Sequence, residues 1–326
     1  MGRAGSTALA VIGVVAVAAA AIGVSYKRDL DRAVDQISHG STMIDTAAGP
    51  IEYAERGAGY PLLSIHGAGG GYDQGLSNVA DLVGEGYRVI APSRFGYLRT
   101  PIPSDSSPAA QADAHAALFE KLNVDKAIIV GISAGATSAL EFALRHPGKV
   151  TALILIVPGT YAPASPVNIE ESRGSAFAFW LVNAGADFFW WATEKVAPSV
   201  LIRFIGVPPE LVAASPPAER ERVTNIVRSV LPLSRRFPGI NIDSTPNLHP
   251  LPLEKINLPT LIMSARDDQF NTAPAAEYAA AGIPNAKLVI YDTGGHLLVG
   301  HEQEARAVIG DFLAEAGVTA APDPAS

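Results

Sequence analysis

The sequence contains no cysteine among its 326 residues. Disulfide bonds, thiolate catalysis and zinc sites built from cysteine are therefore excluded, and the redox compartment cannot be inferred. Charge is also scarce, because only 17% of the residues are charged and 48% are hydrophobic, which is enough apolar surface for a large core. Positive charge is in deficit, with 24 Lys and Arg against 32 Asp and Glu, a formal net charge of -8 and no long basic run. This balance argues against nucleic acid as a partner.

One long uncharged run stands near the N-terminus, "STALAVIGVVAVAAAAIGVSY" from Ser6 to Tyr26. It is long enough to cross a bilayer as a helix, whereas a secretory signal has a shorter apolar centre of about 7–15 residues. We therefore expect residues 1–32 to form a membrane anchor and its flank, and the protein to be located at a membrane. The alanine-rich positions Ala18 to Ala21 leave cleavage as a signal peptide open as the alternative. The flanking basic residues do not decide on which side the catalytic domain lies.

Short β-branched apolar runs alternate with amphipathic stretches along most of the remaining chain. This alternation predicts an α/β fold with a mostly parallel central sheet flanked by helices. We assign residues 41–160 and 258–316 to the two parts of this core. A leading hairpin joined at Gly49-Pro50 is expected to precede the parallel strands, and the composition of residues 317–326 is typical of a disordered tail.

Residues 161–257 contain no clear strand and are expected to form a helical lid inserted into the core. Its rings are predicted to line an apolar substrate channel, or else to pack the lid onto the sheet or to form a surface that enters a membrane. The residues predicted to bind substrate are Phe177, Trp180, Phe188 and Trp191. The neighbouring Arg235 and Arg236 are interpreted either as partners of a substrate carboxylate or as a solvated basic pair.

A single serine stands in the motif Gly131-Ile132-Ser133-Ala134-Gly135, between a strand-like run and a helix-like stretch. In the G-x-S-x-G motif the serine sits on a strained strand-to-helix turn, where side chains at the flanking glycine positions would collide with their neighbours. The alternative role for Ser133 is a helix N-cap, since serine is favoured there.

A serine nucleophile needs a base, and the base needs a carboxylate that orients it. His296 follows the last strand on a Gly-Gly loop and is the predicted base, with His301 as its rival. Asp268, in the loop after the strand that ends at Ala265, is the predicted acid, and Asp267 is the alternate. The order serine, acid, histidine along the chain is the one that this strand-turn-helix serine motif requires.

A glycine-rich loop follows His66 and leaves its backbone amides uncovered. We expect the amide of Ala68, or that of Gly69, to form an oxyanion hole with the amide of Ala134. His66 itself ends a buried strand and is expected to orient this loop rather than to act as a base. The loop matches neither of the glycine-rich phosphate-binding motifs, so nucleotide binding is not expected.

The motifs HGAGGG, GISAG, ARDD and GGH, in this order over roughly residues 41–316, resemble those of the α/β-hydrolase superfamily. The resemblance implies Ser133 as nucleophile, Asp268 as acid, His296 as base, the amides of Ala68 and Ala134 for the oxyanion, and no metal or organic cofactor. A serine nucleophile sets aside haloalkane dehalogenases and most epoxide hydrolases, which use aspartate. The C–C hydrolases of meta-cleavage products share the lidded layout, but their nucleophile turn usually contains S-M-G-G, where this chain has S-A-G-A.

From these features we expect a serine hydrolase that cleaves a carboxylic ester with an apolar acyl or alcohol group. The alternatives are a C–C bond or amide hydrolase, and a catalytically silent ligand-binding protein on the same fold. The expected partners are a small apolar ester and, through the N-terminal helix, a membrane. The sequence does not predict an oligomeric state.

Overall fold

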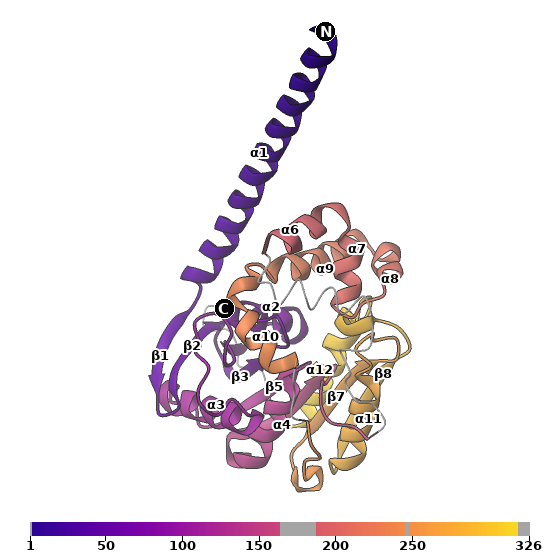
Figure 1. Cartoon of the computed structure of the whole chain (residues 1–326). Helices are drawn as coiled ribbons and strands as arrows, with labels where there is room; N and C mark the ends of the chain where they lie inside the picture. The colour runs from indigo at the N-terminus through magenta and orange to yellow at the C-terminus, as the bar shows by residue number, and fades with distance from the viewer. Residues whose placement is uncertain (1, 164–186, 245–247, 319–326) are drawn as a thin grey trace.

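The computed structural model describes residues 2–163, 187–244 and 248–318. Its centre is an eight-stranded sheet with the order β1-β2-β4-β3-β5-β6-β7-β8 (Figure 1). The strands are β1 Thr42–Thr46, β2 Gly49–Arg56, β3 Tyr60–Ile65, β4 Tyr87–Pro92, β5 Ala127–Ile132, β6 Val150–Ile156, β7 Thr260–Ala265 and β8 Ala286–Tyr291. The pairs from β4 through β3 to β8 are parallel, whereas β2 is antiparallel to both β1 and β4. The predicted mostly parallel sheet is therefore confirmed.

The leading hairpin forms, but its turn lies two residues earlier than predicted. Thr46 pairs with Gly49, so Ala47 and Ala48 make the turn, and Gly49 and Pro50 begin β2. Proline is tolerated there because the first residues of a strand need not donate a ladder hydrogen bond.

Helices cover both faces of the sheet. Successive strand residues point to opposite sides, so a strand that is apolar throughout presents an apolar face on each side. Leu63 packs in the same apolar cluster as residues of α3, α4 and α11, whereas Leu62 packs with residues of α2 and α12. The bounds of these helices are α2 Tyr72–Val83, α3 Pro108–Leu122, α4 Gly135–Arg145, α11 Ala273–Gly282 and α12 Glu302–Glu315. Burial on both faces explains why the central strands are almost continuously apolar.

A second group of helices, which we call the cap, lies across one end of this core (Figure 1). Its described members are α6 Asp187–Val196, α7 Pro198–Phe204, α8 Pro209–Ala214, α9 Pro217–Ser229 and α10 Phe237–Ser244, all within the predicted lid. Trp190, Trp191 and Val227 belong to a small apolar core inside the cap. The cap therefore has packing of its own as well as contacts to the sheet.

The N-terminal helix α1, Gly2–His39, projects away from the body like a rod (Figure 1). Within the parts of the chain that the structure describes, no helix combines the length and the apolarity needed to cross a membrane. The predicted membrane-spanning anchor is thus not supported. At the other end of the chain, Val318 is buried against α12 residues, although residues 317–326 were expected to be a free tail. The rest of that tail, residues 319–326, lies outside the described residues.

Candidate active site

Ser133 follows β5 directly and has a backbone φ of 52°, a left-handed conformation that is strained for a residue with a side chain. A Cβ atom at Gly131 would lie 2.5 Å from the Cβ of Ala139, and one at Gly135 would lie 2.5 Å from the carbonyl oxygen of His66. Both flanking glycines are therefore required by the close approach of α4 to its neighbouring strands. This is the physical basis of the motif in this chain.

Three side chains from the ends of different strands meet at this turn. The Nε2 atom of His296 lies 2.8 Å from the Oγ atom of Ser133, and its Nδ1 atom lies 2.8 Å from Oδ2 of Asp268. The Asp268 side chain is fully buried, and it also accepts hydrogen bonds from the backbone amide of Phe270 and from the hydroxyl of Thr272. The structure thus brings together the predicted nucleophile, base and acid with the connectivity that an activated serine needs.

Asp267, the alternate acid, faces elsewhere. Its Oδ1 atom accepts a hydrogen bond of 2.8 Å from the backbone amide of Gly295, the residue before the histidine. His301, the rival base, stacks on Tyr291 at 4.0 Å and lies 3.3 Å from the Glu304 carboxylate. Asp267 therefore supports the loop that carries His296, and His301 has no contact with the serine.

Two backbone amides, that of Ala68 on the glycine-rich loop and that of Ala134 directly after Ser133, belong to residues that line one cavity. In the described part of the chain, the backbone amides of Ala68 and Ala134 have no hydrogen-bond acceptor, and both residues line the cavity with Ser133. The amide of Gly69, named as a substitute for that of Ala68, donates instead to the hydroxyl of Tyr97 at 3.3 Å. Ala68 and Ala134 remain the candidates for the oxyanion hole.

His66 is completely buried and supports this loop. Its Nε2 atom accepts a hydrogen bond from the amide of Arg94, so Nδ1 carries the proton and donates to the carbonyl of Gly67 at 2.7 Å. Burial, followed by the nearby Arg94 charge, holds the pKa of His66 well below its usual value. The ring is therefore neutral and structural, as expected from its place at the end of a strand.

The cap holds the same loop through two buried arginine–aspartate pairs that the sequence did not reveal. Arg236 of the cap has no exposed side-chain surface, and its guanidinium donates to the Gly70 carbonyl at 2.7 Å and to both oxygens of Asp73. The two interpretations of Arg236, as a partner of a substrate carboxylate and as part of a solvated basic pair, are both wrong. The guanidinium is buried and already bonded to Asp73. Arg235 is exposed.

The second pair joins Arg94 to Asp243 of α10 through the two terminal guanidinium nitrogens, Nη1 and Nη2. Asp243 also accepts a hydrogen bond from the hydroxyl of Tyr97, which in turn accepts from the Gly69 amide. Burial, together with the Asp243 charge, raises the pKa of Tyr97 well above its usual value, so the phenol stays protonated. The loop that carries Ala68 is thus held by the cap at Gly69 and at Gly70.

Gly206, in the turn between α7 and α8, contacts the catalytic residues directly. Its carbonyl accepts hydrogen bonds from the amides of His296 at 3.1 Å and of Gln269 at 3.2 Å. Its φ is +83°, and a Cβ atom there would lie 2.7 Å from the Cβ of His296. The sequence did not predict that Gly206 supports the catalytic loops, because a single glycine in the lid carries no motif.

Two cavities flank the reacting groups. One of about 830 Å³ contains Ser133, Ala68 and Arg94 in its wall, and another of about 520 Å³ reaches His296 over the apolar residues Ile132 and Ile156. In the described ranges, no group of three histidines or carboxylates is placed to hold a metal ion.

The predicted substrate-binding rings are not in these walls, so far as the structure describes them. Phe188 and Trp191 pack against Tyr26 of α1, with ring centroids 5.2 and 5.6 Å from it, and line neither cavity beside the triad. The prediction was wrong for these two because their partner is a helix distant in sequence. Phe177 and Trp180 lie outside the described residues.

Comparison with known proteins gives a consistent result. The family described as alpha/beta hydrolase fold matches residues 60–302. The 2-hydroxymuconate semialdehyde hydrolase of Pseudomonas sp. strain CF600 is 27% identical, over 82% of this chain and 91% of its own. The 2-hydroxy-6-oxo-6-phenylhexa-2,4-dienoate hydrolase of Burkholderia cepacia is 26% identical, over 76% and 84%.

Solved structures of other proteins share the fold of this chain. An alpha/beta hydrolase fold protein from Nakamurella multipartita superposes with a TM-score of 0.62 at 26% identity, covering 85% of this chain and 100% of that one. An esterase from Exiguobacterium antarcticum superposes with a TM-score of 0.60 at 23% identity, covering 83% and 98%, a similarity that concerns the fold alone.

Proposed function

Because the chain belongs to the α/β-hydrolase family and is an enzyme of the hydrolase class, we propose that it cleaves a carboxylic ester through an acyl-enzyme on Ser133. The observation that carries the proposal is the continuous chain of hydrogen bonds from Ser133 through His296 to the buried Asp268, both links being 2.8 Å long. A ligand-binding protein without catalytic activity would not need a serine, a histidine and a buried aspartate joined by hydrogen bonds, so these contacts favour an enzyme.

The mechanism follows from these contacts. His296 Nε2 takes the proton of Ser133 as Oγ bonds to the acyl carbon, and the amides of Ala68 and Ala134 stabilise the oxyanion by about 3 kcal/mol each. The imidazolium then gives its proton to the departing alcohol. Water attacks the acyl-enzyme, its proton passing to His296 and then to Ser133 as the acid leaves. Asp268 holds the Nδ1 proton throughout and stabilises the transient cation.

The charges around the cavities favour an ester without a carboxylate. In the walls that the structure describes, the two arginines are Arg94 and Arg222, and each already faces a carboxylate, that of Asp243 and that of Glu219. A guanidinium paired in this way is poorly suited to bind a substrate carboxylate, since the pair would have to be broken.

Hydrolysis of a C–C bond is the second candidate, and the names of the relatives favour it. They include hydrolases named for 2-hydroxymuconate semialdehyde, for 2-hydroxy-6-oxo-6-phenylhexa-2,4-dienoate and for 2-hydroxy-6-oxononadienedioate, at 26–27% identity. The same serine, histidine and aspartate are compatible with that reaction. The two candidates differ in the bond that is broken at the acyl carbon, which joins it to oxygen in an ester and to carbon in the second case. The substrate named for the Burkholderia cepacia relative also carries a carboxylate.

A fluorophosphonate probe and a substrate panel test the proposal. We expect one adduct on the parent protein and on the control Ser104→Ala, whose serine lines the same cavity, and none on Ser133→Ala. The kcat/KM of Ser133→Ala for p-nitrophenyl butyrate should fall by at least about 10⁴-fold. Turnover of 2-hydroxy-6-oxo-6-phenylhexa-2,4-dienoate, but of neither the ester nor a p-nitroanilide, would establish the second candidate instead. An unlabelled but folded parent would overturn both.

A further inference from the structure

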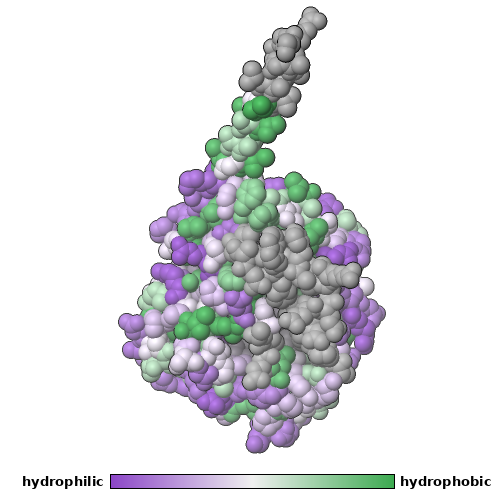
Figure 2. Space-filling model, viewed as in Figure 1, coloured by the Kyte–Doolittle hydropathy of each residue, from purple (hydrophilic) through white to green (hydrophobic). Residues whose placement is uncertain are grey.

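Exposed apolar side chains gather at one end of the molecule. Of the thirteen large hydrophobic residues that are exposed in the described part of the chain, ten lie on α1, α6 or α7. On α1 these residues lie between Ile12, 65% exposed, and Val24, 71% exposed, and on the cap they include Val196 at 82%. Figure 2 shows hydrophobic side chains along the described part of the rod of α1, with paler and hydrophilic side chains at its foot. So concentrated an apolar surface marks an interaction site.

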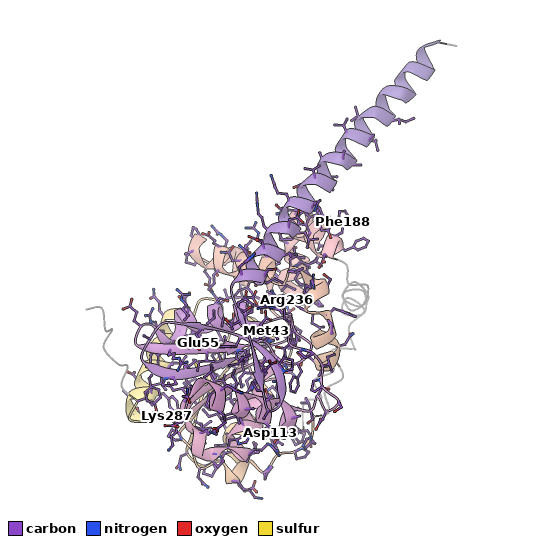
Figure 3. All side chains as sticks on the ribbon, turned by 90° about the vertical axis from the view of Figure 1, so that its left-hand side faces the viewer. Met43, Glu55, Asp113, Phe188, Arg236 and Lys287 are labelled. Atoms are coloured by element: carbon purple, nitrogen blue, oxygen red, sulfur yellow. The ribbon has the colours of Figure 1, made fainter. Side chains whose placement is uncertain are left out.

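The two helical parts of this surface are fixed to each other. Tyr26 packs edge-on against Phe188 at 5.2 Å, and the indole of Trp191 donates a hydrogen bond of 3.0 Å to Asp29. Figure 3 shows Phe188 beside the foot of α1. The exposed face of α6 and α7 and the apolar side chains of α1 therefore form one surface.

Basic side chains border this surface. Arg28, Arg32, Lys195 and Arg228 line one hollow of about 720 Å³ between α1 and the cap, and their side chains are 41–66% exposed. The acids that pair with them are Asp29 and Glu194, which are only 20% and 8% exposed. The basic side chains therefore face solvent, in a chain whose net charge is -8. The exposed carboxylates Asp31 and Asp35 on the same part of α1 offset some of this positive charge.

We propose that α1, α6 and α7 form a docking surface for an anionic lipid bilayer. The apolar side chains enter the boundary between headgroups and acyl chains, and the basic residues at the foot of α1 meet lipid phosphates. Attachment of this kind lies along the surface of a bilayer and needs no spanning helix. Peripheral attachment of this kind would locate the protein at a membrane, as the sequence led us to expect. The proposal does not depend on which reaction the enzyme catalyses.

Co-sedimentation of the full chain with vesicles tests the proposal. We expect binding to vesicles of phosphatidylcholine and phosphatidylglycerol in a 3:1 ratio to exceed binding to phosphatidylcholine alone. Val196→Ser with Val200→Ser should weaken binding about tenfold, and the control Leu288→Ser, an equally apolar exposed site on β8, should not. Arg28→Gln with Arg32→Gln should remove most of the dependence on phosphatidylglycerol, unlike Arg266→Gln elsewhere on the surface.

Three results would overturn the proposal. The first is a parent protein that does not sediment with either kind of vesicle more than it does without vesicles. The second is a valine variant that binds as the parent does, which would leave α1 alone as the contact. A valine variant that changes the sedimentation coefficient without vesicles would instead assign the surface to contacts between copies of the chain.

Discussion

Two adjacent aspartates after β7 occupy chemically different positions. Asp268 is buried and bonded to the imidazole of His296, whereas Asp267 is half-buried and accepts the amide of Gly295. An amide side chain at 267 can still accept that hydrogen bond, but at 268 it cannot stabilise the imidazolium and favours the wrong tautomer.

We therefore predict unequal effects of the same substitution. Asp268→Asn should lower kcat by about 10⁴-fold with little change in KM, and Asp267→Asn should lower it by less than about tenfold. Steady-state kinetics on p-nitrophenyl butyrate measure both. Equal losses would mean that the two carboxylates share the role of the acid.

At the scale of elements, the turn between α7 and α8 links the cap to the catalytic loops. Gly206 accepts hydrogen bonds from both loops, and its missing side chain leaves room for His296. Gly300 provides a matched control, because its φ of +86° is similar and a Cβ atom there meets nothing within 4 Å.

Alanine at Gly300 should cost about 1 kcal/mol of unfolding free energy because of its positive φ. Alanine at Gly206 should cost more, because the clash with His296 adds to the same backbone strain. Only Gly206→Ala should also lower kcat, by at least about tenfold, because its methyl group displaces the His296 ring. Urea denaturation and steady-state kinetics separate the two effects. If Gly300→Ala loses as much activity, the backbone strain and not the clash is responsible.

The elements of the core were predictable for a physical reason. Strands buried on both faces are continuous apolar runs, and the serine motif stands where such a run meets a helix, so local pattern locates both. The cap contacts were not predictable. Arg236 and Asp73 are separated by 163 residues, and nothing local distinguishes a buried arginine from the exposed Arg235 beside it.

The same limit applies to the aromatic residues of the lid. Their composition indicates burial but not the partner, and Trp191 found its partner in α1 instead of a substrate channel. The expected membrane-spanning helix depended on composition as well, and the described helices do not support it. The local sequence pattern predicts which strands and helices are buried. It does not predict which segments distant in sequence pack against each other.

For the molecule as a whole, two buried neutral histidines link stability to pH. Burial lowers the pKa of His66 well below its usual value and that of His115 to about 3. In the unfolded chain both take up a proton near pH 6.5, and in the folded chain they do not. The unfolded state then binds more protons, so the free energy of unfolding falls as the pH drops below about 6.5.

Each histidine should contribute up to about 1.4 kcal/mol per pH unit between pH 6 and 5. His115→Gln should reduce the slope by one proton, whereas His39→Gln, whose side chain is 78% exposed, should leave it unchanged. Urea denaturation at pH 7, 6 and 5 gives the slopes. An unaltered slope in His115→Gln would show that this ring is already charged in the folded protein.

The placement of the tryptophans has a consequence for spectroscopy. All three, Trp180, Trp190 and Trp191, belong to the lid sequence, and the two described ones lie in the small core of the cap, one bonded to Asp29 of α1. The emission of Trp190 and Trp191 therefore reports on the cap and the foot of α1, and no strand of the described sheet contains a tryptophan. A fluorescence titration of this enzyme follows the cap, and circular dichroism is needed to follow the catalytic core.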